Sequence, residues 1–64
     1  MTITAIFLQH PAGICIETED NVTALLDDAD TESSDWLVVQ RQRDQAEVLI
    51  PIGNIASVVI GGHR

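Results

Sequence analysis

Short runs of β-branched and other apolar residues alternate with turn-forming residues along most of the chain. Within several runs, apolar and polar side chains alternate, as they do in a strand with one face against a core. Pro, Gly, Asn and Asp lie between the runs, where they favour turns. The pattern predicts five short strands followed by a loose tail at 61–64. The expected strands are residues 2–8, 14–19, 36–43, 46–52 and 56–60.

The segment from residue 20 to residue 30 fits two structures. As a helix, it has Asp20 or Asn21 as its N-cap and places four apolar residues on one face. As a strand, it places Val22, Ala24 and Leu26 on one face. Three aspartates would lie in the last turn of the helix, where the helix dipole disfavours negative charge. We therefore expect a strand here, with the helix as the alternative.

Residues 47–60 contain two β-branched runs separated by a breaker sequence. Pro51 cannot donate a ladder hydrogen bond, and Gly53 and Asn54 tolerate the left-handed backbone of a tight corner. The runs on either side favour extended structure. The stretch predicts a strand, a short corner and a second strand that leaves in a new direction.

The sequence Glu47-Val48-Leu49-Ile50-Pro51-Ile52-Gly53-Asn54-Ile55-Ala56-Ser57-Val58 resembles the second Sm motif of Sm, LSm and Hfq-type proteins. In that family an apolar strand passes through a short 3₁₀ corner into a final β-branched strand. The resemblance implies a mainly all-β fold, a single Sm-like or SH3-like barrel of five to six strands spanning residues 1–64. It also implies a ring, in which the last two strands of neighbouring subunits pair edge to edge.

Alternation within the last two strands identifies the expected contact surface. If one face of each strand lines the core, Leu49 and Val59 remain outside unless another copy covers them. Pairing between copies would cover these apolar edges and satisfy their backbone groups. We therefore expect a homo-oligomer whose interface includes Leu49, Ile50, Val58, Val59 and Ile60.

The resemblance departs from the family where RNA is bound. Sm proteins carry Arg-Gly just before the corner, and Hfq carries Lys-His nearby. This chain has Pro51, Ile52 and Gly53 there, none with a charged or donating side chain. RNA binding is therefore the second alternative for function.

Length and composition narrow the remaining choices. A chain of 64 residues forms one domain with a thin core, so self-association is the expected reinforcement. Cys15 is the single cysteine, which excludes an internal disulfide. No apolar run is long enough to cross a membrane, and no signal-peptide pattern precedes the first strand. These features indicate a cytoplasmic protein with no membrane partner.

The charge is strongly acidic, with ten acidic residues, three arginines and a net charge of −7. Such a surface repels phosphate, so nucleic acid is not an expected partner. The first alternative function is an acidic inhibitor that imitates a nucleic-acid backbone and binds a basic protein; a phage origin is compatible with it. Arg41 and Arg43 are expected to share a strand face, where they balance acids on a neighbouring strand or subunit. The candidate partner surface consists of Trp36, Arg41, Arg43, Asp27, Asp28 and Asp30.

Residues capable of catalysis are few and scattered. We interpret His10 and His63 as surface histidines, and Cys15 as a buried or half-buried structural thiol. No residue is identifiable as the partner that would hold a general base. His10, Cys15 and His63 are not spaced as a metal site, and the acids lack the pattern of a calcium hand. The sequence therefore predicts a non-enzymatic assembly or adaptor module without metal or cofactor.

Overall fold

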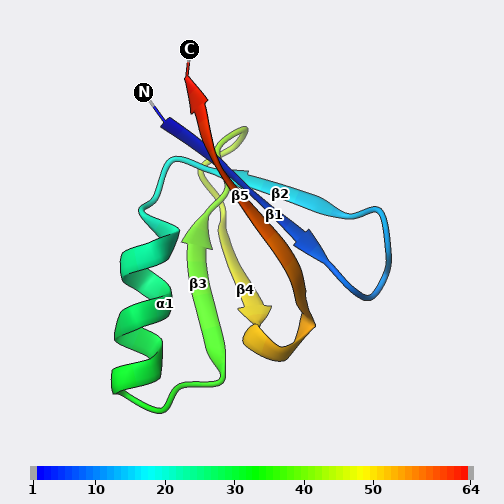
Figure 1. Cartoon of the computed structure of the whole chain (residues 1–64). Helices are drawn as coiled ribbons and strands as arrows, with labels where there is room; N and C mark the ends of the chain where they lie inside the picture. Colours follow the sequence, from blue (N-terminus) through cyan, green and yellow to red (C-terminus); the bar gives the residue numbers. More distant parts are fainter. Residues whose placement is uncertain (1, 64) are drawn as a thin grey trace.

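The computed structural model describes the backbone of residues 2–63 and the side chains of residues 2–61. It consists mainly of strands, with one α-helix and one short 3₁₀ turn (Figure 1). In chain order the elements are β1 (Thr2–Leu8), β2 (Cys15–Thr18), α1 (Val22–Thr31), β3 (Trp36–Gln40), β4 (Glu47–Pro51), η1 (Ile52–Asn54) and β5 (Ile55–His63).

The strands form two small antiparallel sheets, so the expected closed barrel is not observed. One sheet has the order β2-β1-β5, and the other is the β3-β4 hairpin. The two sheets meet at a bridge between Thr18 and Arg41, beside which the Gln42 N–H donates to the Glu17 carbonyl oxygen at 2.8 Å. The expected 3₁₀ corner is confirmed, because η1 joins β4 to β5.

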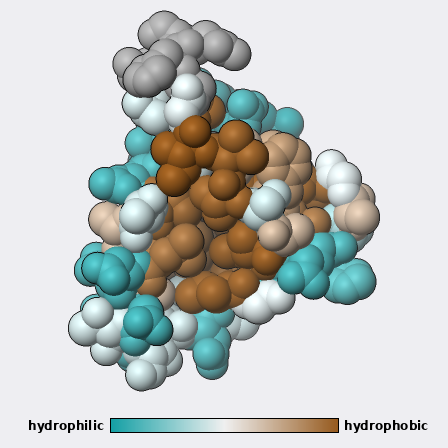
Figure 2. All heavy atoms as spheres, viewed as in Figure 1, coloured by the Kyte–Doolittle hydropathy of each residue, from teal (hydrophilic) through white to brown (hydrophobic). Residues whose placement is uncertain are grey.

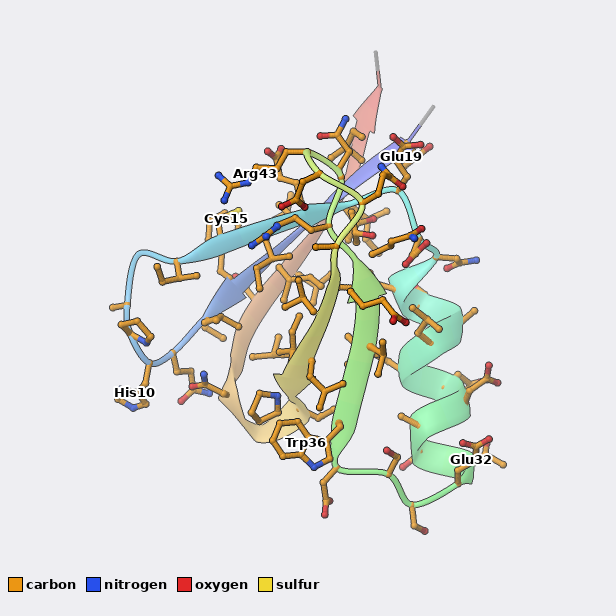
Figure 3. All side chains as sticks on the ribbon, turned by 180° about the vertical axis from the view of Figure 1, so that it is seen from behind. His10, Cys15, Glu19, Glu32, Trp36 and Arg43 are labelled. Carbon is orange, nitrogen blue, oxygen red and sulfur yellow. The ribbon has the colours of Figure 1, made fainter. Side chains whose placement is uncertain are left out.

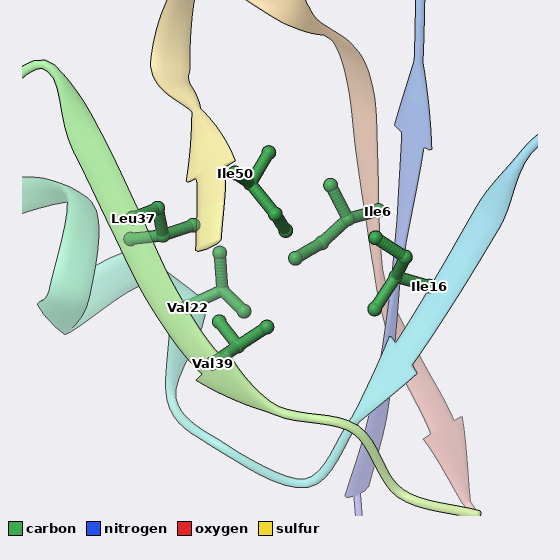
Figure 4. Close-up of a cluster of buried hydrophobic side chains, with 6 residues drawn as sticks. All are labelled: Ile6, Ile16, Val22, Leu37, Val39 and Ile50. Carbon is green, nitrogen blue, oxygen red and sulfur yellow. The ribbon is translucent and has the colours of Figure 1, made fainter. Parts of the chain in front are cut away.

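The core lies between the two sheets and one end of the helix (Figure 4). The three-stranded sheet contributes Ile6 and Ile16, which are paired directly across β1 and β2. The hairpin and the helix supply the other four buried side chains of this cluster, which are Leu37, Val39, Ile50 and Val22. All six are branched aliphatic residues, so hydrophobic burial holds the two sheets together.

Residues 22–31 form α1, so the expectation of a strand over residues 20–30 was wrong. The Asn21 side chain accepts a hydrogen bond from the Ala24 N–H at 3.2 Å and caps the helix. Val22 and Ala29 are buried on the inner face, while the aspartates point to solvent. Tertiary burial therefore outweighs the unfavourable charge at the C-terminal end, which is worth only about 0.3–1 kcal/mol per exposed group.

The ends of two strands differ from the expectation by more than one residue. β3 ends at Gln40, and Arg41 is followed by a turn instead of a strand reaching residue 43. Gln45, just after this turn, has a φ of 61°, a left-handed conformation that precedes β4. At the other end of the chain, β5 continues through Gly61 to His63, where a loose tail was expected. Pairing with β1 extends the strand, since Thr2 faces His63 in the register.

Candidate interaction surfaces

The outer face of the β3-β4 hairpin is apolar and exposed. Val38 lies directly opposite Leu49, and Trp36 lies opposite Pro51. Leu49 keeps 59% of its surface exposed, and Trp36 keeps 50%. Figure 3 shows Trp36 at the end of the hairpin remote from Arg43. We call Trp36, Val38, Leu49 and Pro51 the hairpin face.

The outer face of the three-stranded sheet is also apolar. Ala5 faces Val59 across β1 and β5, and Phe7 follows on the same face of β1. Val59 is 55% exposed and Phe7 is also exposed. Figure 2 shows hydrophobic side chains gathered at the centre of one face of the molecule, with hydrophilic ones around them. Exposed apolar side chains that gather on one face of a small protein are characteristic of contact surfaces.

Within residues 2–63 each sheet has two edge strands, β2 and β5 in one sheet and β3 and β4 in the other. β5 pairs only with β1, and β4 pairs only with β3. The corner η1 separates these two strands along the chain and turns one away from the other. Both therefore present unpaired backbone N–H and C=O groups, which can accept another strand.

The structure distributes the expected interface residues unequally. Leu49 and Val59 lie on the outer surface, in agreement with the alternation, and Val58 is half-buried on the inner face. Ile60 is 57% exposed although it faces inward opposite Thr4, because the core does not extend to that end of β5. Ile50 is 1% exposed and packs in the core opposite Leu37, so including its side chain in an interface was wrong.

Arg41 and Arg43 do not share a strand face, because both follow the end of β3. Arg41 binds Asp44 within the same turn, through Nε to Oδ1 at 2.9 Å and Nη2 to Oδ2 at 2.7 Å. These bonds, with the Ala46 N–H, lower the pKa of Asp44 from 3.8 to about 2. The same hydrogen bond raises the pKa of Arg41. The partner acid is therefore local, where a neighbouring strand or subunit was expected.

A groove of about 540 Å³ separates β2 from the β3-β4 turn. Ile14 and Cys15 line one side, and Arg41 and Arg43 line the other. Cys15 is exposed, so the expectation of a buried or half-buried thiol was wrong; as Figure 3 shows, it lies near Arg43. Partial desolvation and the nearby Glu17 carboxylate raise the pKa of Cys15, which keeps the thiol protonated.

The other candidate residues lie apart from these arginines. Asp27, Asp28 and Asp30 are exposed on α1. No ion pair joins them to an arginine within the described side chains. His10 is exposed in the β1-β2 turn, as expected, whereas the side chain of His63 lies outside the described residues. The structure therefore splits the expected partner surface into the acidic helix, Trp36 on the hairpin face and the arginine turn.

A second hollow, of about 300 Å³, lies beside the start of α1 and was missed by the sequence reasoning. Its walls come from β1, β5 and the β2-α1 connection, which are distant in sequence, so no local pattern indicated it. The lining residues are Thr2, Thr4, Glu19, Asp20, Asn21, Val22, Thr23 and Ile60.

Comparisons with known proteins add no relative: no family model, curated protein or solved structure matches the chain. No group of three His, Cys, Asp or Glu side chains converges as metal ligands among the described residues. Within residues 2–63, no helix is long and apolar enough to span a bilayer. The candidate sites therefore rest on the geometry of this chain alone.

Proposed function

We propose that this protein is a non-enzymatic module that assembles with copies of itself into a ring, through the edges of β4 and β5, as an Sm-like small barrel does. The observation that carries the proposal is the pair of free edges, each bearing an exposed apolar side chain, Leu49 on β4 and Val59 on β5. Pairing β4 of one copy with β5 of the next would satisfy these two edges at once and leave β2 and β3 as the outer strands.

The two edges differ, which favours a ring over a two-fold dimer. β4 has five residues and β5 has nine, and they belong to different sheets. A contact between two different surfaces is heterologous, and it closes into a ring when the rotation between copies permits. Each contact also buries apolar area, worth roughly 25 cal/mol per Å². That is the stabilisation that a small chain needs most, since its core cluster has six buried side chains among the described residues.

The net negative charge opposes assembly, because copies of the chain repel one another. Three of the acids lie away from the edges that would pair. Asp27, Asp28 and Asp30 lie on α1, whereas Glu47 is the acidic residue among those of β4 and β5. The repulsion between copies is long-ranged and is screened by salt, while the apolar contacts are not. Assembly is therefore expected to strengthen as the salt concentration rises.

The test is the mass in solution by light scattering. The wild-type chain is expected to have the mass of several chains, and Leu49→Lys and Val59→Lys to lower it. Thr23→Lys is the matched control, since it introduces the same charge at an exposed helical position outside both edges. A wild-type mass equal to one chain at moderate and high salt would refute self-assembly.

We propose binding of a basic protein partner as a second function, and the acids of α1 favour it. Asp27, Asp28 and Asp30 are all exposed, and no described arginine pairs with them. Such a surface attracts cationic partners and loses them as salt rises. The test compares binding of an arginine-rich peptide by the wild type and by the triple Asp→Asn variant at low and high salt. Equal affinity of the wild type and the variant for the peptide would show that the acids of α1 do not form the binding surface.

A further inference from the structure

The hollow beside the start of α1 brings two acidic residues together with hydroxyl groups. Glu19 and Asp20 lie in the connection just before the helix, and Figure 3 shows Glu19 near the end where α1 begins. Asp20 accepts a hydrogen bond from the Gln40 N–H through Oδ2 at 2.9 Å, which fixes its carboxylate. Glu19 is exposed and has no ion pair within residues 2–61. The hollow is therefore negatively charged and unneutralised from within the described chain.

Thr4 is the buried polar group of this hollow. Its side chain is 4% exposed, yet its hydroxyl makes no hydrogen bond to any described residue, in contrast to the buried Thr18, which donates to the Gln40 carbonyl oxygen. No fully enclosed side-chain oxygen or nitrogen in the described part of the chain lacks a partner. The Thr4 hydroxyl is therefore not fully enclosed, and Thr4 lines the hollow. A buried hydroxyl in this position is a ready hydrogen-bond acceptor.

The remaining wall is apolar. Ile60 lies directly opposite Thr4 across β1 and β5, and it remains 57% exposed because no part of the core covers it. Val22 closes the inner side. An apolar wall beside acidic and hydroxyl acceptors suits a side chain with an aliphatic stem and a cationic head, which is how lysine and arginine bury themselves at a surface.

The helix terminus does not reverse this preference. The N-terminal end of α1 contributes about half a positive charge, and Asn21 already satisfies the Ala24 N–H. Two carboxylates outweigh that half charge. No group of three acidic, histidine or cysteine side chains converges there among the described residues.

We propose that this hollow is a receptor site for one arginine or lysine side chain of a basic protein partner. The cationic head binds Glu19, Asp20 and the Thr4 hydroxyl, and the aliphatic stem lies on Ile60. The inference rests on the second function proposed above and is independent of self-assembly. It adds a defined pocket to what is otherwise diffuse attraction by the acids of α1.

The experiment is an NMR titration with three short capped peptides, in which arginine, lysine or norleucine is placed between glycines. The arginine and lysine peptides are expected to shift the backbone amide signals of Thr4 and Ile60, and the norleucine peptide to leave them unchanged. Glu19→Gln and Thr4→Val are expected to weaken binding about tenfold, the effect of losing one hydrogen bond to a charged group. Thr4→Ser, which keeps the hydroxyl, is expected to bind like the wild type and controls for folding.

Glu32→Gln is the matched control, since it removes the same charge at the far end of α1 (Figure 3). It is expected to change the affinity less than twofold. Equal weakening by Glu32→Gln and Glu19→Gln would overturn the pocket and leave the diffuse acidic surface standing. No binding of the single-arginine or single-lysine peptide by the wild type would overturn the pocket alone, since the second function is tested by the arginine-rich peptide. Tighter peptide binding by Arg43→Gln would assign the pocket to an arginine of a second copy and overturn the basic partner.

Discussion

The side-chain amide of Asn54 makes two hydrogen bonds to the backbone of His10, which lies 44 residues earlier in the chain. Its Oδ1 accepts the His10 N–H at 3.0 Å, and its Nδ2 donates to the His10 carbonyl oxygen at 2.7 Å. The Asn54 carbonyl oxygen also accepts the Gln9 N–H at 2.8 Å. One residue of the corner before β5 therefore fixes the turn between β1 and β2.

Replacing Asn54 with Ala is expected to destabilise the fold by about 1–3 kcal/mol, since each of two lost hydrogen bonds contributes about 0.5–1.5 kcal/mol. Urea unfolding measures the change. Asn54→Asp keeps the acceptor and loses the donor, so an intermediate effect is expected. Gln45→Ala, which removes one exposed side-chain bond within a turn, is the control. If Asn54→Ala lowered the free energy of unfolding no more than Gln45→Ala, the two hydrogen bonds between Asn54 and His10 would have no role in stability.

Thr18→Val is expected to cost about 1–3 kcal/mol, although the two side chains have nearly the same shape. The Thr18 hydroxyl is fully buried, donates to the Gln40 carbonyl oxygen at 2.8 Å and accepts the Asp20 N–H at 3.1 Å. Its loss leaves buried groups unsatisfied where the two sheets meet. The exposed Thr23→Val provides the comparison, and similar unfolding midpoints for the two variants would contradict this account.

Asp30→Lys is expected to stabilise the protein by about 0.3–1 kcal/mol, because a cation at the C-terminal end of α1 complements the helix dipole. Asp30→Asn is expected to give part of that gain. Asp35→Lys makes the same charge change beyond the helix, and it separates the dipole effect from relief of net negative charge. The three variants are compared by thermal unfolding, and a gain from Asp35→Lys equal to that from Asp30→Lys would remove the dipole explanation.

Asp44 is expected to make stability depend on pH in acid. Its folded-state pKa of about 2 lies below the ordinary value of 3.8, chiefly because of the Arg41 hydrogen bonds. The stabilisation is therefore complete above pH 3.8 and is lost as the pH falls through about 2. Unfolding measured across this range is expected to show a shallower slope for Asp44→Asn than for the wild type. Matching slopes would mean that the ion pair is absent in solution.

RNA binding is expected to be negligible. Arg41 is engaged with Asp44, so Arg43 is the described arginine that remains unpaired, against a net charge of −7. The affinity of proteins for nucleic acid depends on several unopposed cations. A filter-binding assay with oligo-U and oligo-A at physiological salt checks this, and submicromolar affinity for either would contradict it.

The strands were predictable because local chemistry decides them. Pro51, Gly53 and Asn54 interrupt the extended structure at the corner. The β-branched runs on either side strongly favour strands. The segment that became α1 was not decided locally. Its aspartates oppose a helix, and the burial of Val22 and Ala29 that favours one depends on strands distant in sequence.

The surfaces were predictable only in part for the same reason. Alternation along a strand placed Leu49 and Val59 outside, as found. It could not show that the core ends before Ile60, or that the chain would bring Thr4 and Glu19 to one hollow. Arg41 was misplaced because β3 ends earlier than its polar tail suggests, at the turn that lets Asp44 reach back.

The pairing of β1 with β5 determines when the protein can fold. β1 is the central strand of its sheet, and its register runs from Thr2 opposite His63 to Leu8 opposite Ile55. During synthesis, β1 leaves the ribosome long before β5, the strand that pairs with its free edge. Until β5 has been made, β1 can pair only with the four-residue β2. A stalled or truncated chain would therefore expose the unpaired edge of β1 to proteases and to aggregation with other nascent chains. Such long-range pairing also slows folding, so the native sheet forms only after the last strand has been translated.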